Sequence, residues 1–245
     1  MCTVSFLPHR QGYQLGMNRD EQRTRVKGLF GPAERVGMVT VVGPSEPTGG
    51  RWIACNSRGV TFALLNWYAK SGPNISKPYS RGDLLNGLAS HSDPGQVMSG
   101  LREQALERVR PFRLVMVVNE SRLLYEWRWA GEQVEELSHP WAPRIWASSG
   151  YDEPAANEAR KEVFDSFVNR FKQQDSEALY AFHGSHLPEK GARSVCMHRK
   201  EAATVSFTEV SIFECKGFVR YVGGPPCESD LNAGHTAAFD LDSDS

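Results

Sequence analysis

The residue with the clearest chemical potential is Cys2, which directly follows the first methionine. Removal of Met1, which a small second residue permits, would give Cys2 a free α-amine beside its thiol. A free thiol has a pKa of about 8.5 and an α-amine one of about 7.7–8.0, so the amine can accept the thiol proton directly or through one water. One residue would then supply both nucleophile and general base. The alternative is that a small second residue serves methionine processing alone.

A second polar feature is the run Asn18-Arg19-Asp20-Glu21, which follows a predicted strand. If the strand continues, alternation places Asn18 and Asp20 on one face and Arg19 and Glu21 on the other. A buried charge needs partners, so this run is a reasonable neighbour for an N-terminal amine. The other interpretation is a polar turn that ends the strand, with an Arg–Glu pair on the surface.

The elements that must position these residues are mostly strands. Alternating or continuous apolar runs separated by turn residues predict strands in two groups, before and after a helical middle. The predicted strands are Val4–Leu7, Tyr13–Met17, Met38–Val42, Trp52–Cys55, Val60–Trp67, Phe112–Val118, Leu123–Trp129, Gln133–Leu137, Arg144–Ser148, Ser194–His198, Thr204–Ile212 and Phe218–Val222.

Helical patterns interrupt these strands in the middle of the chain. A short helix is expected from Arg81, an amphipathic one over Gln96–Val109, a long one after Asp152-Glu153-Pro154, and another over Ser176–Phe182. This order predicts one α+β domain over residues 1–223. Residues 224–245 contain several aspartates and few apolar side chains, so they are predicted to be a disordered acidic tail.

Composition excludes several classes of protein. The net charge is −1, which gives no electrostatic footprint for nucleic acid, and the apolar runs are too short to span a membrane. No signal peptide is recognisable at the N-terminus. The cysteines are odd in number and form no Cys-x-x-Cys motif, so they do not predict disulfides. The sequence therefore predicts a cytoplasmic protein.

Several separated motifs occur in an order that resembles the NRDE family, also called the transport and Golgi organisation protein 2 family. The resemblance extends from the N-terminus to about Ile212. The motifs are Met1-Cys2-Thr3, Asn18-Arg19-Asp20-Glu21, Gly49-Gly50-Arg51-Trp52, Asn56-Ser57-Arg58-Gly59, Leu64-Leu65-Asn66 and Ser80-Arg81-Gly82.

The resemblance implies a four-layer αββα sandwich of the N-terminal nucleophile (Ntn) hydrolase type. It implies that Cys2 is the nucleophile and that Asp20 holds its α-amine. Arg19 would lie near the thiolate or the substrate carbonyl, and Asn66, after the strand Thr61–Leu65, would donate a hydrogen bond to an oxyanion. The expected reaction is hydrolysis of a non-peptide C–N amide bond in a small molecule.

Three further residues are expected to border the substrate. Trp67 precedes a glycine-rich segment and could line the mouth of a pocket. Ser149, in Trp146-Ala147-Ser148-Ser149-Gly150, stands where the family commonly keeps an asparagine. Arg193 enters a late predicted strand and could face the same site.

The resemblance also implies an alternative, a non-catalytic protein that binds or traffics haem or another apolar small molecule. The axial-ligand candidates are His183, His186, Met197 and His198. The preferred interpretation is that the histidines near residue 183 end a helix and that Cys196 packs in the core. The sequence therefore predicts no metal site and no cofactor, with haem as a ligand only in the alternative, and it leaves the oligomeric state open.

Overall fold

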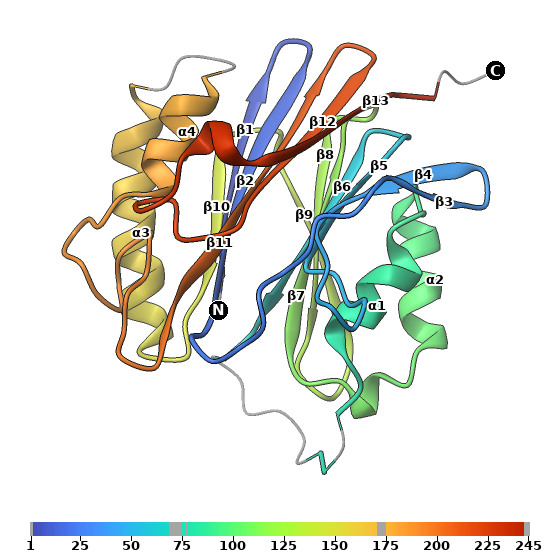
Figure 1. Ribbon diagram of the computed structural model, residues 1–245. Coiled ribbons are helices and arrows are strands. Elements are labelled where there is room, and N and C mark those ends of the chain that lie inside the picture. The colour runs from blue at the N-terminus through green and yellow to red at the C-terminus, as the bar shows by residue number, and fades with distance from the viewer. Residues whose placement is uncertain (1, 69–74, 77, 171–174, 243–245) are drawn as a thin grey trace.

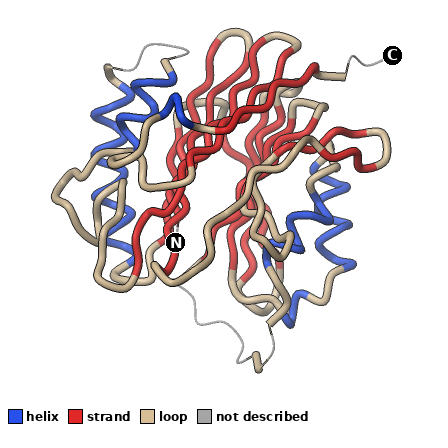
Figure 2. Tube along the Cα trace, in the orientation of Figure 1, coloured by secondary structure: helices blue, strands red, loops and turns tan. Residues whose placement is uncertain are grey.

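The structure, a computed structural model, describes residues 2–68, 75–76, 78–170 and 175–242. Two antiparallel β-sheets stack face to face, and a pair of helices covers the outer face of each sheet (Figure 1). Figure 2, coloured by secondary structure, shows the same layers, with the strands in the middle and the helices on both sides. The predicted α+β class and the four-layer αββα sandwich are confirmed.

The first sheet has six described strands in the order β10-β1-β2-β11-β12-β13, so the two N-terminal strands lie beside strands from late in the chain. Their bounds are β1 Cys2–His9, β2 Gly12–Gln22, β10 Arg144–Ser148, β11 Ala202–Phe213, β12 Lys216–Val222 and β13 His235–Asp240. Its outer face is covered by α3 and α4, which span Glu153–Val168 and Ser176–His183.

The second sheet has seven described strands in sequence order, β3 to β9. Their bounds are β3 Glu34–Val36, β4 Val39–Val42, β5 Ile53–Asn56, β6 Val60–Asn66, β7 Phe112–Val118, β8 Leu123–Trp129 and β9 Val134–His139. Two helices, α1 (Arg81–Leu88) and α2 (Pro94–Glu103), cover its outer face (Figure 1). Short 3₁₀ turns span Leu106–Arg108 and Leu231–Ala233.

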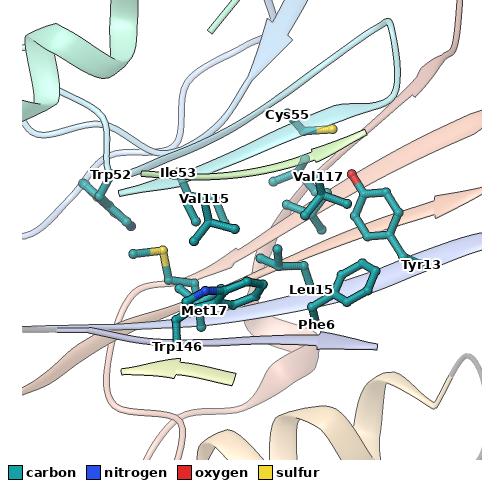
Figure 3. Close-up of a cluster of buried hydrophobic side chains, with 14 of the residues drawn as sticks. Phe6, Tyr13, Leu15, Met17, Trp52, Ile53, Cys55, Val115, Val117 and Trp146 are labelled. Carbon is teal, nitrogen blue, oxygen red and sulfur yellow. The ribbon is translucent and has the colours of Figure 1, made fainter. Parts of the chain in front are cut away.

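The main core lies between the two sheets. Figure 3 shows Phe6, Leu15 and Trp146 of the first sheet facing Ile53 and Val115 of the second. These side chains are almost completely buried. Burial of large apolar side chains is the main favourable term in folding, at about 25 cal/mol per Å² of apolar surface removed from water. This core therefore fixes how the two sheets face each other, and with it the residues at their ends.

The predicted strands agree with the structure except at one place, and one predicted helix is shorter than expected. The helix predicted over Gln96–Val109 begins earlier, at Pro94, because the Asp93 side chain caps the amides of Gly95 and Gln96. It ends at Glu103, and the chain continues as the 3₁₀ turn Leu106–Arg108. The helical spacing extended too far because Leu106 and Val109 are buried, although they lie outside the α-helix.

The predicted strand Ser194–His198 is wrong. This segment is a loop with bends and one isolated bridge, between His198 and Ala203. Its amides bond within the loop region instead, from Cys196 to the Ser185 carbonyl at 2.8 Å and from His198 to the Gly191 carbonyl at 3.0 Å. The apolar pattern that indicated a strand reflects burial under the helices of the first sheet.

The prediction of a disordered tail over residues 224–245 is also corrected for its described part. Residues 235–240 form β13, which pairs with β12 along the edge of the first sheet. Ala237 and Phe239 pack against the main core and alternate with the exposed residues Thr236, Ala238 and Asp240, a period-2 pattern that the acidic composition obscured. Residues 243–245 lie outside the described residues. The single-domain boundary at residue 223 stays a prediction.

In the described part of the chain, no helix has the length and apolar character needed to cross a membrane.

Candidate active site

Cys2 is the first residue of β1, between the neighbouring strands β2 and β10. It pairs with Arg19 of β2 and with Ser148 of β10. Directly paired residues of antiparallel strands point to the same face, so all three side chains point toward the second sheet. The structure therefore brings Cys2 and Arg19 together, as the resemblance implied, and adds Ser148.

Cys2 and Arg19 border a pocket of about 270 Å³ at one end of the two sheets, and Ser148 lies outside its lining. The second sheet contributes Leu64 and Asn66 at the end of β6, and the start of α1 contributes Arg81 and Gly82. Five arginines and three acidic residues line this pocket, so its charge is net positive. They are Arg19, Arg25, Arg51, Arg81 and Arg110, with Asp20, Glu21 and Glu46.

Arg19 is fixed by contacts within the pocket wall. Its guanidinium stacks over the Trp52 ring, 4.2 Å from the ring centroid, and donates to the Glu46 carboxylate at 2.5 Å. Glu46 also accepts from Arg25 at 2.8 Å. Glu21 also lies 3.7 Å from the Arg19 guanidinium and 3.9 Å from that of Arg25. These two carboxylates balance Arg19 and Arg25, so the net positive charge of the pocket comes from its other arginines.

Asp20 points to the opposite face of β2, as the alternation predicted. Its carboxylate accepts from the Thr204 hydroxyl at 2.7 Å and lies 3.6 Å from the Arg160 guanidinium of α3. The pairing of β11 with β2 shifts between Thr204 and Ser206, opposite the step from Asp20 to Arg19. Such a bulge bends the strand and re-aims its side chains.

Arg160 connects this carboxylate to the loop before β11 and to β1. Its guanidinium donates to the Ser194 carbonyl at 3.0 Å, to the Ala192 carbonyl at 3.4 Å and to the Thr3 hydroxyl at 2.9 Å. The side chain is completely buried. Sequence reasoning missed Arg160, and its place among the buried residues of α3 is not visible from residue type, because an arginine on an amphipathic helix normally faces solvent.

Burial controls the protonation of both Cys2 and Asp20. It raises the pKa of the Cys2 thiol, and the Asp20 backbone N–H and the Arg19 charge oppose this rise. Burial also raises the pKa of the Asp20 carboxyl, and the Arg160 charge opposes it. In the chain with Met1 attached, the thiol is therefore held in its neutral form and needs a base to become a nucleophile.

The serine beside Cys2 is Ser148. Its hydroxyl accepts a hydrogen bond from the Cys2 backbone nitrogen at 3.0 Å. Ser149 is instead turned toward the following loop, where its hydroxyl donates to the Tyr151 carbonyl at 2.7 Å. Ser149 does not line the pocket. The sequence could have indicated Ser148, because it lies two residues after the buried Trp146 and therefore on the same face of β10.

The other two predicted substrate-binding residues also lie outside the pocket lining. Trp67 follows β6, and the Arg128 guanidinium lies 5.9 Å from its ring centroid. Arg193 is half exposed and pairs with Asp152, the residue before α3, at 3.1 Å. Asn66 does line the pocket, and its amide nitrogen donates to the Tyr68 hydroxyl at 2.6 Å.

The haem-ligand candidates lie away from this pocket. His183 is completely buried under the first sheet, where its Nε2 lies 2.8 Å from the Ser5 hydroxyl, and burial lowers its pKa to about 3. Met197 is also completely buried. His186 and His198 lie near each other, with ring centroids 5.0 Å apart, in the region of Cys196.

Comparison with solved structures shows which known proteins share this fold. The chain is similar to a mutant of conjugated bile acid hydrolase from Clostridium perfringens, with 12% identity, a TM-score of 0.51 and coverage of 99% of this chain and 97% of the other. It is similar to penicillin V acylase from Agrobacterium tumefaciens, with 9% identity, a TM-score of 0.54 and coverage of 99% and 92%. At these identities the likeness establishes the fold alone, that of the Ntn hydrolases.

Sequence comparison with curated proteins gives no significant match. A family model, described as Transport and Golgi organisation 2, matches residues 1–185, which is more than half of the chain. The resemblance drawn from the motifs is therefore confirmed, and the chain belongs to the Transport and Golgi organisation 2 family.

Proposed function

We propose that this protein is an N-terminal-cysteine amidohydrolase that cleaves a non-peptide C–N amide bond in a small molecule with an anionic group. The observation that carries the proposal is the position of Cys2 at the first residue of β1, facing a pocket in which Arg19 and Asn66 also lie. A first-strand cysteine whose backbone nitrogen lies beside its own thiol is the arrangement that Ntn chemistry requires.

The reaction begins with removal of Met1, which converts the Cys2 amide nitrogen into an α-amine. The amine takes the thiol proton, and the thiolate attacks the carbonyl carbon of the substrate amide. The C–N bond then breaks, the amine product leaves with that proton, and a thioester to Cys2 remains. Water attacks the thioester, with the α-amine as base, and releases the acid and the free thiol.

Three residues have supporting roles in this proposal. Ser148 holds the Cys2 nitrogen, since it already accepts its hydrogen bond at 3.0 Å. Asn66 donates to the oxyanion, and it lines the pocket from the opposite sheet. Asp20, whose backbone N–H interacts with the thiol, positions the end of β2 against Cys2 through its buried contacts with Thr204 and Arg160.

The lining of the pocket supports an anionic substrate. Arg81 donates to the Pro111 carbonyl at 3.0 Å and forms no salt bridge with a carboxylate of the described residues. Arg110 is exposed at the same pocket and likewise has no such salt bridge within the described chain. A carboxylate, sulfonate or phosphate on the substrate would neutralise these arginines.

The proposal is tested by intact mass and N-terminal sequencing of the purified protein, followed by a thiol-reactive amide probe. We expect Cys2 as the first residue and labelling of Cys2 that is lost in Cys2→Ala. Cys215→Ala is the matched control, because Cys215 is an exposed free thiol outside the pocket. Retention of Met1 in the purified protein would overturn the proposal, since no α-amine would then lie beside the thiol.

A further inference from the structure

A second group of chemically active residues lies apart from the Cys2 pocket. His186 follows α4, Cys196 and His198 lie in the loop before β11, and Cys227 follows β12. One potential ligand atom from each residue lies within 4.8 Å of all the others. Four separate backbone positions therefore converge on one point between the loop 184–201 and the segment after β12.

The distances within this group match those of a tetrahedral metal site. The sulfurs of Cys196 and Cys227 are 3.4 Å apart, and His198 Nε2 lies 3.6 Å from the first and 3.2 Å from the second. Around a zinc ion with Zn–S bonds of about 2.3 Å and Zn–N bonds of about 2.0–2.1 Å, tetrahedral geometry gives about 3.8 Å between sulfurs and about 3.5 Å between sulfur and nitrogen.

The fourth member supplies an independent observation. The Nε2 atom of His186 is buried and has no hydrogen-bond partner among the described residues. A buried ring nitrogen without a partner is costly, so native structures rarely leave one. A metal ion bound by the group would account for this nitrogen.

We propose that His186, Cys196, His198 and Cys227 bind a structural zinc ion with all four of its ligands from the protein. Two thiolates and two imidazoles are the donor set that selects Zn²⁺ in a tetrahedral geometry. Because four protein ligands leave no open position, the site is structural and not catalytic. Binding releases the two thiol protons, since each cysteine ligates as a thiolate.

This zinc ion would brace the part of the fold that supports the Cys2 site. The ligand Cys196 lies two residues after Ser194, whose carbonyl accepts the hydrogen bond from Arg160. Arg160 in turn lies against the Asp20 carboxylate. The metal would therefore tie the loop before β11 to the segment after β12 and hold the carbonyls that orient Arg160.

The sequence did not predict this metal site, because its ligands are far apart in the chain. Cys196 and His198 were assigned to a strand and to core packing, and Cys227 was assigned to a disordered tail. In the fold, Cys227 lies 29 residues from His198 in the chain and yet 3.2 Å from it in space. No short spacing motif marks such a set, because its members come from loops on either side of a hairpin.

The experiment is a metal analysis of the full chain purified without chelators. We expect about one zinc per chain by mass spectrometry of the metals. Replacement by Co²⁺ should give the intense visible bands of tetrahedral cobalt–thiolate coordination. Cys227→Ser and His186→Ala should lose the bound zinc, and Cys215→Ser, at an exposed free thiol outside the group, should retain it.

The cobalt spectrum uses the unmodified protein, so the test does not depend on the folding of any variant. A wild-type chain that holds no zinc and gives no tetrahedral cobalt bands overturns the proposal. So does a Cys196–Cys227 disulfide found by mass mapping of the protein purified under reducing conditions. Zinc retained in folded Cys227→Ser would also overturn it, because that zinc would be bound elsewhere.

Discussion

The Arg160 guanidinium lies 3.6 Å from the Asp20 carboxylate, and both side chains are completely buried. This pair joins α3 to β2 directly behind the strand end that positions Cys2. Burial raises the pKa of the Asp20 carboxyl, and the charge of Arg160 is the largest influence that lowers it. Because water does not reach either side chain, each charge of this pair depends on the other for its neutralisation.

Arg160→Met is expected to destabilise the protein by about 3–5 kcal/mol, because it leaves a buried carboxylate without its ion-pair partner. Arg193→Met, which removes a half-exposed ion pair with Asp152, should cost about 0–1 kcal/mol. Urea unfolding measures both. The double variant Asp20→Asn with Arg160→Met should recover part of the loss. Equal destabilisation by the two arginine variants would contradict the prediction.

The charge of the pocket predicts how Cys2 reacts with alkylating reagents. The rate with iodoacetate relative to iodoacetamide should be higher at Cys2 than at exposed Cys215, because Arg81 and Arg110 line the pocket and attract the anionic reagent. Arg81→Gln should lower this ratio roughly three- to tenfold at Cys2. Added salt should lower it as well. Peptide mapping with mass spectrometry gives the rate at each thiol.

Arg193→Gln is the control for this experiment, because Arg193 lies outside the pocket lining and should leave the ratio unchanged. The same ratio at Cys2 and Cys215 in the unmodified protein would show that the arginines do not act on a bound anion.

Haem is expected to leave its Soret band unshifted when it is titrated with the protein. His183 is buried against Ser5, and His186 and His198 both belong to the proposed zinc site, so none of these imidazoles is free to ligate an iron. The measurement is an absorption titration at micromolar protein. A shifted band in the unmodified protein that disappears in His198→Ala would contradict this prediction and support the carrier alternative.

The fold could be predicted from the sequence because its strands carry strong local signals. Residues of β6 and β7 are mostly apolar, β1 and β2 contain alternating apolar residues, and the motifs in β1, β2 and β6 occur in the order of the family. The alternation in β2 also predicted correctly that Arg19 and Asp20 point to opposite faces. Cys2, Arg19, Asp20 and Asn66 were assigned to one site, and all four border one pocket, although the Asp20 carboxylate points to the opposite face of β2. Their catalytic roles stay predictions.

The partners of these residues could not be predicted, because they come from distant parts of the chain. Thr204 and Arg160 reach Asp20 only after β11 pairs with β2 and α3 packs on the sheet. Ser148 and Ser149 differ in the sequence only by one position. A one-residue change in a strand reverses the face, so the choice depends on the register of β10 against β1.

Glu126 gives the protein a predictable response to acid. It is almost completely buried on β8 and accepts from Arg113 and Arg128 at 2.7 Å each. Burial alone would raise its pKa, but the hydrogen bonds and charges of these arginines lower it to about 2 from an ordinary value of 4.5. Because the folded pKa is the lower one, the contribution of Glu126 to stability is present above about pH 4.5 and is lost as the pH falls toward 2.

Glu126→Gln should therefore destabilise the protein at neutral pH by about 1.5–3 kcal/mol, because the partly buried Arg113 and Arg128 lose the carboxylate that accepts their hydrogen bonds. It should also flatten the fall in unfolding free energy below pH 4.5. Glu135→Gln is the control, because Glu135 is exposed and its replacement removes only an ion pair with Arg128 at 3.8 Å. Urea unfolding at a series of pH values gives both slopes. If Glu126→Gln and the unmodified protein lose stability equally with acid, another carboxylate carries the response.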